Sequence, residues 1–219
     1  GRFDNGGRLL VGHTAAHSVG GGNSKIQVQA TDSTGRISVV QHRNEASGSP
    51  FITLGKSRGT SNGSTTILQS GDEIGTLTWA GADGNDLDNQ ACCITGIVDG
   101  APGSNDMPGR LEFRTTSDGS STATTRMKIS KEGYVTKPYN PSFMAYGNSS
   151  WTDLNAGTNL TPYVFPNTAH NIGSHYNTTS GKFTAPVTGV YQLHWNIFCA
   201  SPSNQTSAAT LEFYVHKNS

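Results

Sequence analysis

Residues 8–136 form a series of short segments with extended character, which Gly, Asn, Asp and Ser interrupt at close intervals. Apolar and polar residues alternate in several of these segments; Leu111 and Phe113, for example, stand on either side of Glu112. Alternation with a period of two is typical of a β-strand that buries one of its faces. No stretch keeps apolar residues at helical spacing without an interrupting glycine. The sequence therefore predicts an all-β chain.

The candidate strands of this region are short, and turn-forming residues flank each of them. One side of each strand is expected to be buried. Glu112 is predicted to be an ordinary exposed residue between two buried neighbours. The candidates are Arg8–Val11, Lys25–Ala30, Arg36–Gln41, Phe51–Leu54, Thr65–Gln69, Ile74–Trp79, Cys92–Val98, Arg110–Thr115 and Arg126–Ile129.

The composition indicates that one chain has little apolar surface for a core of its own. Charged residues make up 14% of the 219 residues, against roughly 25% in a typical globular protein, and hydrophobic residues make up 33%. Short strands of this kind gain burial from identical neighbouring chains. The 15 basic and 15 acidic residues cancel, so no net field favours nucleic acid or an anionic membrane. The apolar runs are too short for membrane insertion.

The three cysteines do not form a disulfide framework, because their number is odd and Cys92 and Cys93 are adjacent. Reduced, buried thiols are expected, with Cys199 as the third. The chain begins without an initiator Met or a signal peptide. We expect it to be a fragment at both ends.

The segment 181–195 contains two expected strands on either side of a turn. Lys182–Ala185 is extended, Thr188 and Gly189 supply the turn, and residues 190–195 alternate between polar and apolar side chains. Trp195 is expected in the core, because aromatic residues at alternating strand positions usually pack inside.

The ordered residues Phe183, Gly189, Tyr191 and Leu193, with Asn171–Gly173 and Tyr176–Asn177 upstream, resemble the central signature of the complement C1q globular-head family. This resemblance implies a C1q/TNF-like jelly-roll β-sandwich that assembles as a trimer at the end of a stalk. Residues 142–219 are therefore expected to form such a head, incomplete at its C-terminus. Pro141–Tyr146 is its expected first strand and Ser207–His216 a later one.

The region before the head resembles the shaft of tail fibres of tailed bacteriophages, particularly those of marine and cyanobacterial phages. The residues that carry this resemblance are Val98–Gly103, Asn105–Leu111, Phe113 and Thr125–Ile129, with Arg8–Gly12, Leu54–Gly59, Gly71–Gly75 and Ala80–Gly84 upstream. In such fibres the pattern often precedes a self-cleaving chaperone domain. Here the head signature follows instead, which leaves trimerisation to the head. The expected domains are a β-rich shaft at 1–136, a Pro-containing connector at 137–141 and the head.

Together the two resemblances imply a structural protein of the virion, namely an elongated homotrimeric tail fibre that attaches the phage to its host. The implied partners are other tail or baseplate proteins and a host surface receptor, a glycan. The implied location is the virion, with assembly in the host cytoplasm. Two alternatives stay open: a decoration fibre of the capsid or collar, and a secreted C1q-like carbohydrate-binding module.

No enzyme and no cofactor are expected, because the sequence contains no nucleophile elbow, catalytic triad order or phosphate-binding loop. A carboxylate pair for cleaving a polysaccharide could come from Asp72 and Glu73 with Glu112 or Asp118. Nothing in the sequence brings two of these carboxyl groups to the separation that such a reaction needs.

Asp83, Asp86 and Asp88 offer oxygen ligands at a spacing that suits Ca²⁺, but Ile94 stands where an EF-hand has its bidentate Glu. Asp beside Gly also builds ordinary turns, so a solvated loop without a metal is predicted. Trp151 lies in a polar stretch and is the candidate for receptor contact, together with the segment 201–206.

Overall fold

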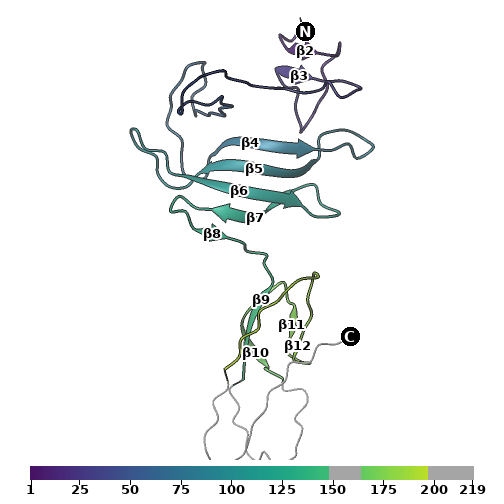
Figure 1. The fold of residues 1–219 in the computed structure, drawn as a ribbon, viewed down its shortest axis with the longest axis vertical. Coiled ribbons are helices and arrows are strands. Elements are labelled where there is room, and N and C mark those ends of the chain that lie inside the picture. Colours follow the sequence, from purple (N-terminus) through teal and green to yellow (C-terminus); the bar gives the residue numbers. More distant parts are fainter. Residues whose placement is uncertain (148–163, 197–219) are drawn as a thin grey trace, which may run out of the picture. The chain divides into compact units, whose positions relative to one another are not determined.

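The computed structural model describes residues 1–147 and 164–196. Every regular element in these ranges is a β-strand (Figure 1), which confirms the all-β prediction. The chain divides into two compact units, residues 1–183 and 184–219. In the described part of the chain, no helix has the length and apolar character needed to cross a membrane.

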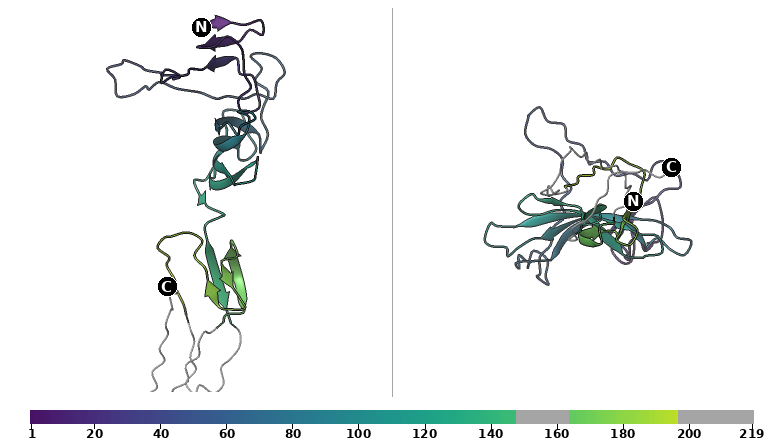
Figure 2. Two further views of the ribbon diagram at one scale, coloured as in Figure 1. Left: turned by 90° about the vertical axis from the view of Figure 1, so that its right-hand side faces the viewer. Right: turned by 90° about the horizontal axis from the view of Figure 1, so that it is seen from below.

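The largest element is an antiparallel sheet of five strands in the order β4-β5-β6-β7-β8. Consecutive strands are neighbours throughout, and they form a single twisted layer (Figure 2). The structure confirms the four strands predicted in this region. Their bounds are Glu73–Ala80 for β4, Gln90–Val98 for β5, Gly109–Thr116 for β6 and Ala123–Ile129 for β7, and Val135–Thr136 forms the short edge strand β8.

A small three-stranded sheet precedes it. β1 (Arg2–Phe3) pairs antiparallel with β2 (Leu9–Val11), and β2 pairs parallel with β3 (Ile26–Val28). The predicted strands at 8–11 and 25–30 are therefore confirmed in shorter form. Leu10 is 1% exposed and forms the centre of this sheet's core.

The three strands predicted between residues 36 and 69 do not form, so these predictions are wrong for the chain on its own. Apolar side chains are present there, but Ile37, Phe51 and Ile52 are 73%, 75% and 75% exposed. A strand needs a neighbour that accepts and donates its backbone hydrogen bonds, and no described strand pairs with this region. The alternating pattern is thus present in the sequence, but no described strand pairs with these segments.

The described head residues form two antiparallel pairs. β9 (Ser142–Tyr146) pairs with β10 (Asn167–Ile172), and β11 (Tyr176–Asn177) pairs with β12 (Lys182–Phe183). β9 confirms the predicted first strand. The strand expected at 190–195 does not form, and Trp195 is 52% exposed, so its assignment to the core is wrong. The strand expected at 207–216 lies outside the described residues.

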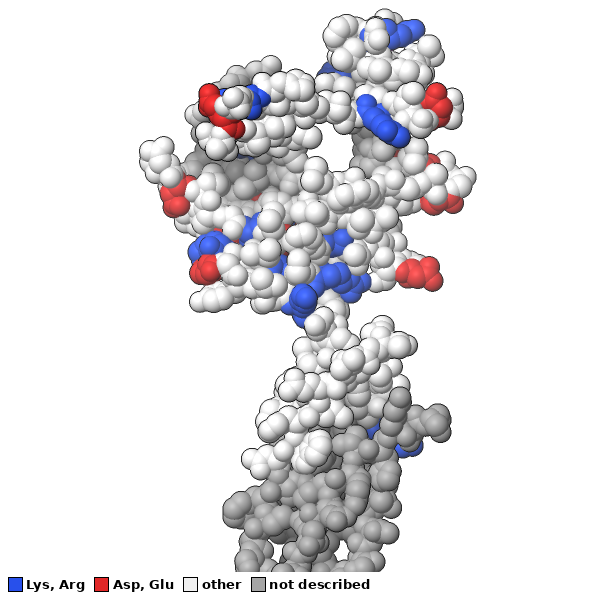
Figure 3. Space-filling view, viewed as in Figure 1, with Lys and Arg blue, Asp and Glu red and all other residues white. Residues whose placement is uncertain are grey.

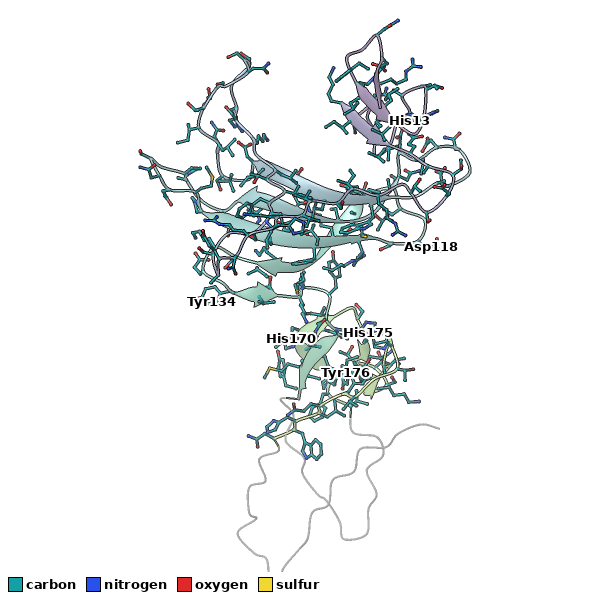
Figure 4. The ribbon with its side chains drawn as sticks, turned by 45° about the horizontal axis from the view of Figure 1, so that its top comes forward. His13, Asp118, Tyr134, His170, His175 and Tyr176 are labelled. Carbon is teal, nitrogen blue, oxygen red and sulfur yellow. The ribbon has the colours of Figure 1, made fainter. Side chains whose placement is uncertain are left out.

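Two of the signature residues, Asn171 and Phe183, lie around Tyr176, which is labelled in Figure 4 and is 6% exposed, together with Phe143 of β9. The ring of Phe143 stacks on Tyr176 at 4.8 Å and on Phe183 at 5.0 Å between centroids. The side-chain amide of Asn171 donates to the Tyr176 carbonyl oxygen at 2.7 Å and accepts from its N–H at 3.1 Å. The pattern read as a family signature is therefore a packed aromatic cluster with a backbone clamp.

Candidate functional site

The pairing register sorts the side chains of the five-stranded sheet onto two faces. Thr95 stands opposite Glu112 across β5 and β6, and one residue further along Ile94 stands opposite Phe113. Successive side chains of a strand point to opposite faces, so these two pairs define different surfaces. The polar face carries Thr76, Thr78, Cys93, Thr95, Ile97, Arg110, Glu112, Arg114, Thr125 and Lys128; the apolar face carries Leu77, Trp79, Cys92, Ile94, Leu111, Phe113, Met127, Ile129 and Val135.

Glu112 lies at the centre of the polar face and is only 8% exposed. Arg110 Nε donates to Glu112 Oε1 at 2.7 Å. Arg114 donates to Oε2 through Nε at 3.0 Å and Nη2 at 2.9 Å, and the Thr125 hydroxyl donates to the same oxygen at 2.8 Å. The carboxylate is therefore held from both sides by charge-assisted hydrogen bonds, which are about twice as strong as neutral ones.

The pKa of Glu112 reflects two opposing effects. Burial raises the pKa. The hydrogen bonds from Arg110, Thr125 and Arg114, together with the charge of Arg114, lower it by more than burial raises it, so that the pKa falls to about 2. Glu112 is thus ionised at neutral pH. The prediction that Glu112 is an ordinary exposed residue is wrong, because its two arginine neighbours on the same strand fold over it.

The arginines extend this network across the polar face. Arg110 Nη1 lies 3.2 Å from Asp99 Oδ1, and Arg114 Nη1 donates to Glu73 Oε1 at 2.9 Å. Figure 3 shows basic side chains gathered over the five-stranded sheet, while the acidic ones visible in this view lie mostly toward its two sides. The spacing Arg-x-Glu-x-Arg at 110–114 is the sequence signal for this network, because positions i, i+2 and i+4 share one face of a strand.

The four candidate carboxylates for a catalytic pair lie in three different settings. Glu73 and Glu112 share Arg114, whereas two hydrogen bonds from Arg58, at 2.6 and 2.8 Å, hold the pKa of Asp72 below its usual range. Asp118 lies in the β6–β7 loop at one end of the sheet (Figure 4). Asp72 and Glu112 are therefore arginine-bound carboxylates whose pKa lies below the usual range, as in an ion pair.

The apolar face is open. Leu77, Trp79, Leu111 and Val135 are 51%, 52%, 44% and 58% exposed. Four large apolar side chains on one sheet face form a continuous patch, which in a soluble protein marks an interaction surface. This face is the candidate functional site among the described residues.

One end of the apolar face is covered from within the chain. A Cβ added at Gly75 would lie 2.5 Å from the Cβ of Leu54, closer than real carbon atoms approach. Glycine at this position of β4 therefore lets the 50–58 segment reach the sheet. Further along the face, Leu77 and Trp79 remain about half exposed.

A border of the apolar face carries one organised cation. The Arg126 guanidinium donates to the hydroxyls of Thr115 at 3.0 Å and Ser117 at 2.7 Å. The ring of Tyr139 lies against it, 4.6 Å from ring centroid to Cζ. This cation–π contact ties residue 139 of the predicted connector to the sheet.

The acidic loop between β4 and β5 is organised by its own backbone. Asp83 Oδ1 accepts from the N–H groups of Asn85 at 2.8 Å and Asp86 at 3.1 Å, and these bonds lower the pKa of Asp83. Asp86 Oδ1 accepts from the N–H of Asp88 at 2.9 Å. Such contacts are those of a turn, as the sequence predicts for this segment.

Asp88 faces a different set of donors from its two neighbours. Its Oδ1 accepts from the Ser18 hydroxyl at 2.7 Å and the Gly21 N–H at 3.0 Å, which links the β4–β5 loop to the β2–β3 connection. Within residues 1–147 and 164–196, no group of three or more His, Cys, Asp or Glu side chains is arranged to hold a metal ion. The three aspartates thus accept hydrogen bonds from different sets of donors.

A shallow depression of about 350 Å³ lies between the β4–β5 and β6–β7 loops. Asn89, Gln90, Thr116, Ser117 and Asp118 contribute its polar lining. Hydroxyl, amide and carboxylate groups of this kind can bind sugar hydroxyls. The receptor candidates Trp151 and 201–206 lie outside the described residues, so their prediction stands as made.

Two of the cysteines are described, and neither forms a disulfide. Cys93 is buried on the polar face, as expected of a structural thiol, while Cys92 is half-buried on the apolar face opposite Trp79. Cys199 lies outside the described residues.

Comparison with known proteins finds one matching family model and a similar solved structure. The family model for the C1q domain matches residues 143–217. Among solved structures, the carboxy-terminal domain of the bacteriophage T5 L-shaped tail fibre is similar, with a TM-score of 0.45 and 18% identity. That likeness covers 61% of this chain and 50% of the T5 chain, so this chain spans half of its length. None of the curated proteins matches. The predicted all-β fold with a C1q segment is confirmed.

Proposed function

We propose that this protein is a structural component of a phage virion, a homotrimeric tail fibre that attaches the particle to the surface of its host. The C1q segment at 143–217 supports this proposal, because it follows a region whose residues 98–129 resemble a tail-fibre shaft. The proposal involves binding without catalysis.

The observation that carries the proposal is the open apolar face of the five-stranded sheet. Residues on this face alternate with charged ones as in a half-buried strand, yet Leu77, Trp79 and Val135 are more than half exposed. Burying such side chains stabilises a protein by about 1.5–3 kcal/mol each. A fibre of identical chains would supply this burial, as the resemblance to trimeric fibres implies.

Attachment by a trimer relies on repetition of one contact. A head that presents the same weak site three times binds a surface covered with receptor far more tightly than one copy does. Trp151 and residues 201–206 are the proposed receptor contacts, and a surface glycan is the proposed ligand. The proposed partners at the other end are tail or baseplate proteins of the virion.

The test is the mass and shape of the purified chain in solution, by light scattering combined with small-angle scattering. Three chains in an elongated particle would support the fibre. A compact monomer would contradict it and would favour the secreted C1q-like carbohydrate-binding module.

Attachment itself is tested by retention of labelled protein on a panel of bacterial cells. We expect Trp151→Ala to reduce retention, with Trp195→Ala as the control for loss of an exposed tryptophan. Equal retention of Trp151→Ala and the wild type would exclude Trp151 as a contact. Binding of the labelled protein to phage particles, without binding to cells, would favour a decoration fibre. Release of reducing sugar from host envelope by the unmodified protein would contradict a purely binding role.

A further inference from the structure

We infer that the apolar face of the five-stranded sheet packs against the same face of further copies of this chain, so that residues 73–136 carry a copy-to-copy interface of their own. This inference deepens the proposed function and rests on it for the number of copies. The sequence-based expectation gives the strands burial against identical chains but leaves trimerisation to the head, and the inference names the surface that forms the contact.

The chemistry of the face suits an identical surface. The charged side chains of β6 all lie on the polar face, where Glu112 binds Arg110 and Arg114. Arg126 lies at the border of the apolar face, and Thr115, Ser117 and Tyr139 already contact it. The middle of the face is therefore apolar and uncharged. Two such surfaces meet without burying an unpaired charge.

The area is sufficient for a specific contact. The four main strands contain 8, 9, 8 and 7 residues. At about 3.3 Å per residue and 4.8 Å between strands, they span about 26 by 19 Å, or about 500 Å². Two whole faces in contact would bury about 1,000 Å², which is the size at which a specific protein interface begins, and the end near Gly75 that Leu54 covers takes no part in the contact. Around a three-fold axis each chain contacts two others, so the total is larger.

The occupant is a copy because the unburied apolar surface is not confined to this face. Ile37, Phe51 and Ile52 are at least 73% exposed in a separate segment that contains alternating residues but no paired strand. A different protein bound to the sheet would leave that segment uncovered. Further copies supply both a cover for the sheet and neighbours for the 36–69 segment.

Cys92 provides a reporter on the face itself. It stands opposite Trp79 on β4 and Thr115 on β6, and its thiol is half-buried in one chain. Cys93, next in sequence, is 3% exposed on the other face and serves as an internal reference. The experiment measures alkylation of Cys92 by iodoacetamide in the full chain, with fragment-ion mass spectrometry to separate the two thiols. The same sample is weighed by light scattering.

The matched variants are Leu111→Asp on the face and Leu87→Asp in the β4–β5 loop, because the two leucines are 44% and 40% exposed. We expect Cys92 in the wild-type oligomer to react at least tenfold more slowly than in the urea-unfolded chain. Leu111→Asp should restore most of the reactivity, and Leu87→Asp should leave the protection intact. An oligomer of Leu111→Asp with a reactive Cys92 would show that the head and the sheet associate separately, which also supports the inference.

Two results would overturn it. A wild-type trimer in which Cys92 reacts as fast as in the unfolded chain would refute the inference and leave the proposed trimeric fibre standing. A wild-type monomer would refute both, whether Cys92 is reactive or covered by its own chain. The wild-type measurements decide the matter even where Leu111→Asp fails to fold.

Discussion

The two faces of the five-stranded sheet differ in how far their side chains are buried within one chain. On the polar face, Arg110 and Arg114 lie over the sheet and bind Glu112, so that Thr95 and Ile97 are 1% and 2% exposed. On the apolar face, Leu77 and Trp79 are about half exposed. In one chain the middle of the charged face is therefore buried, whereas large side chains of the hydrophobic face stay half exposed.

The cause is the reach of the side chains. Arginine carries a long aliphatic stem, which covers apolar atoms beneath it while its guanidinium stays paired. Leucine and phenylalanine have no polar group with which to lock a cover in place, and they are buried only when a second layer packs on them. The charge network thus acts as a lid on a single-layer sheet.

The largest effect is expected at the centre of the polar face. Glu112→Gln removes the charge that Arg110 and Arg114 share, while Arg110 keeps Asp99 and Arg114 keeps Glu73. Loss of one member of a buried ion pair lowers the free energy of unfolding by about 3 kcal/mol. Urea unfolding measures it. Glu132→Gln is the control, because its pair with Lys131 is exposed and worth far less. Equal losses for the two variants would mean that the network is not a closed lid.

Gly75→Ala tests the covered end of the apolar face. The new Cβ would lie 2.5 Å from the Cβ of Leu54, so the 50–58 segment must move, and we expect a loss of about 2 kcal/mol. Gly81→Ala is the matched control, because no atom lies within 4 Å of a Cβ added there. Thermal unfolding is the measurement, and an unchanged Gly75→Ala variant would place Leu54 away from the sheet.

Leu77→Ser tests the open part of the same face. In a lone chain the loss of a half-exposed leucine has little effect, whereas in an assembly that buries it the loss is about 1.5 kcal/mol per chain. The melting temperature should fall more for Leu77→Ser than for Leu87→Ser in the loop. Identical melting curves would indicate that the face stays exposed to water.

The smallest effect is confined to acid. The pKa of Glu112 is depressed to about 2, so its ionised form stabilises the fold fully above the pKa of an unfolded glutamate, about 4.3, and this stabilisation is lost as the pH falls toward 2. The stability difference between wild type and Glu112→Gln should be constant from pH 7 to 5 and shrink below it. A difference that shrinks already near pH 6 would contradict the depressed pKa.

The sequence predicted local features well and non-local ones poorly. β4 to β7 were predictable because alternation and turn residues lie within each segment. The aromatic cluster around Tyr176 was visible as a family signature before its contacts were known. The absence of strands at 36–69 and 190–195 was not predictable. A strand also requires a neighbour, and alternation does not indicate where that neighbour comes from.

Glu112 shows the same limit at the level of one residue. Its neighbours on β6 correctly indicate that two faces exist, but period-two alternation does not say which face one chain covers. The conventional assumption that apolar residues are buried and charged ones exposed is wrong for β6, where Glu112 is buried and Leu111 is exposed. The spacing of Arg110 and Arg114 around Glu112 carried the correction.

The most direct test of the central claim is hydroxyl-radical footprinting of the full chain, which reads the accessibility of side chains on both faces in one experiment. We predict that Trp79 and Met127 on the apolar face are oxidised slowly in the native protein and rapidly in the Leu111→Asp variant, with the exposed Met107, at 52%, oxidised rapidly in both. Rapid oxidation of Trp79 and Met127 in the native protein, at the rate of Met107, would contradict the claim that further copies cover this face.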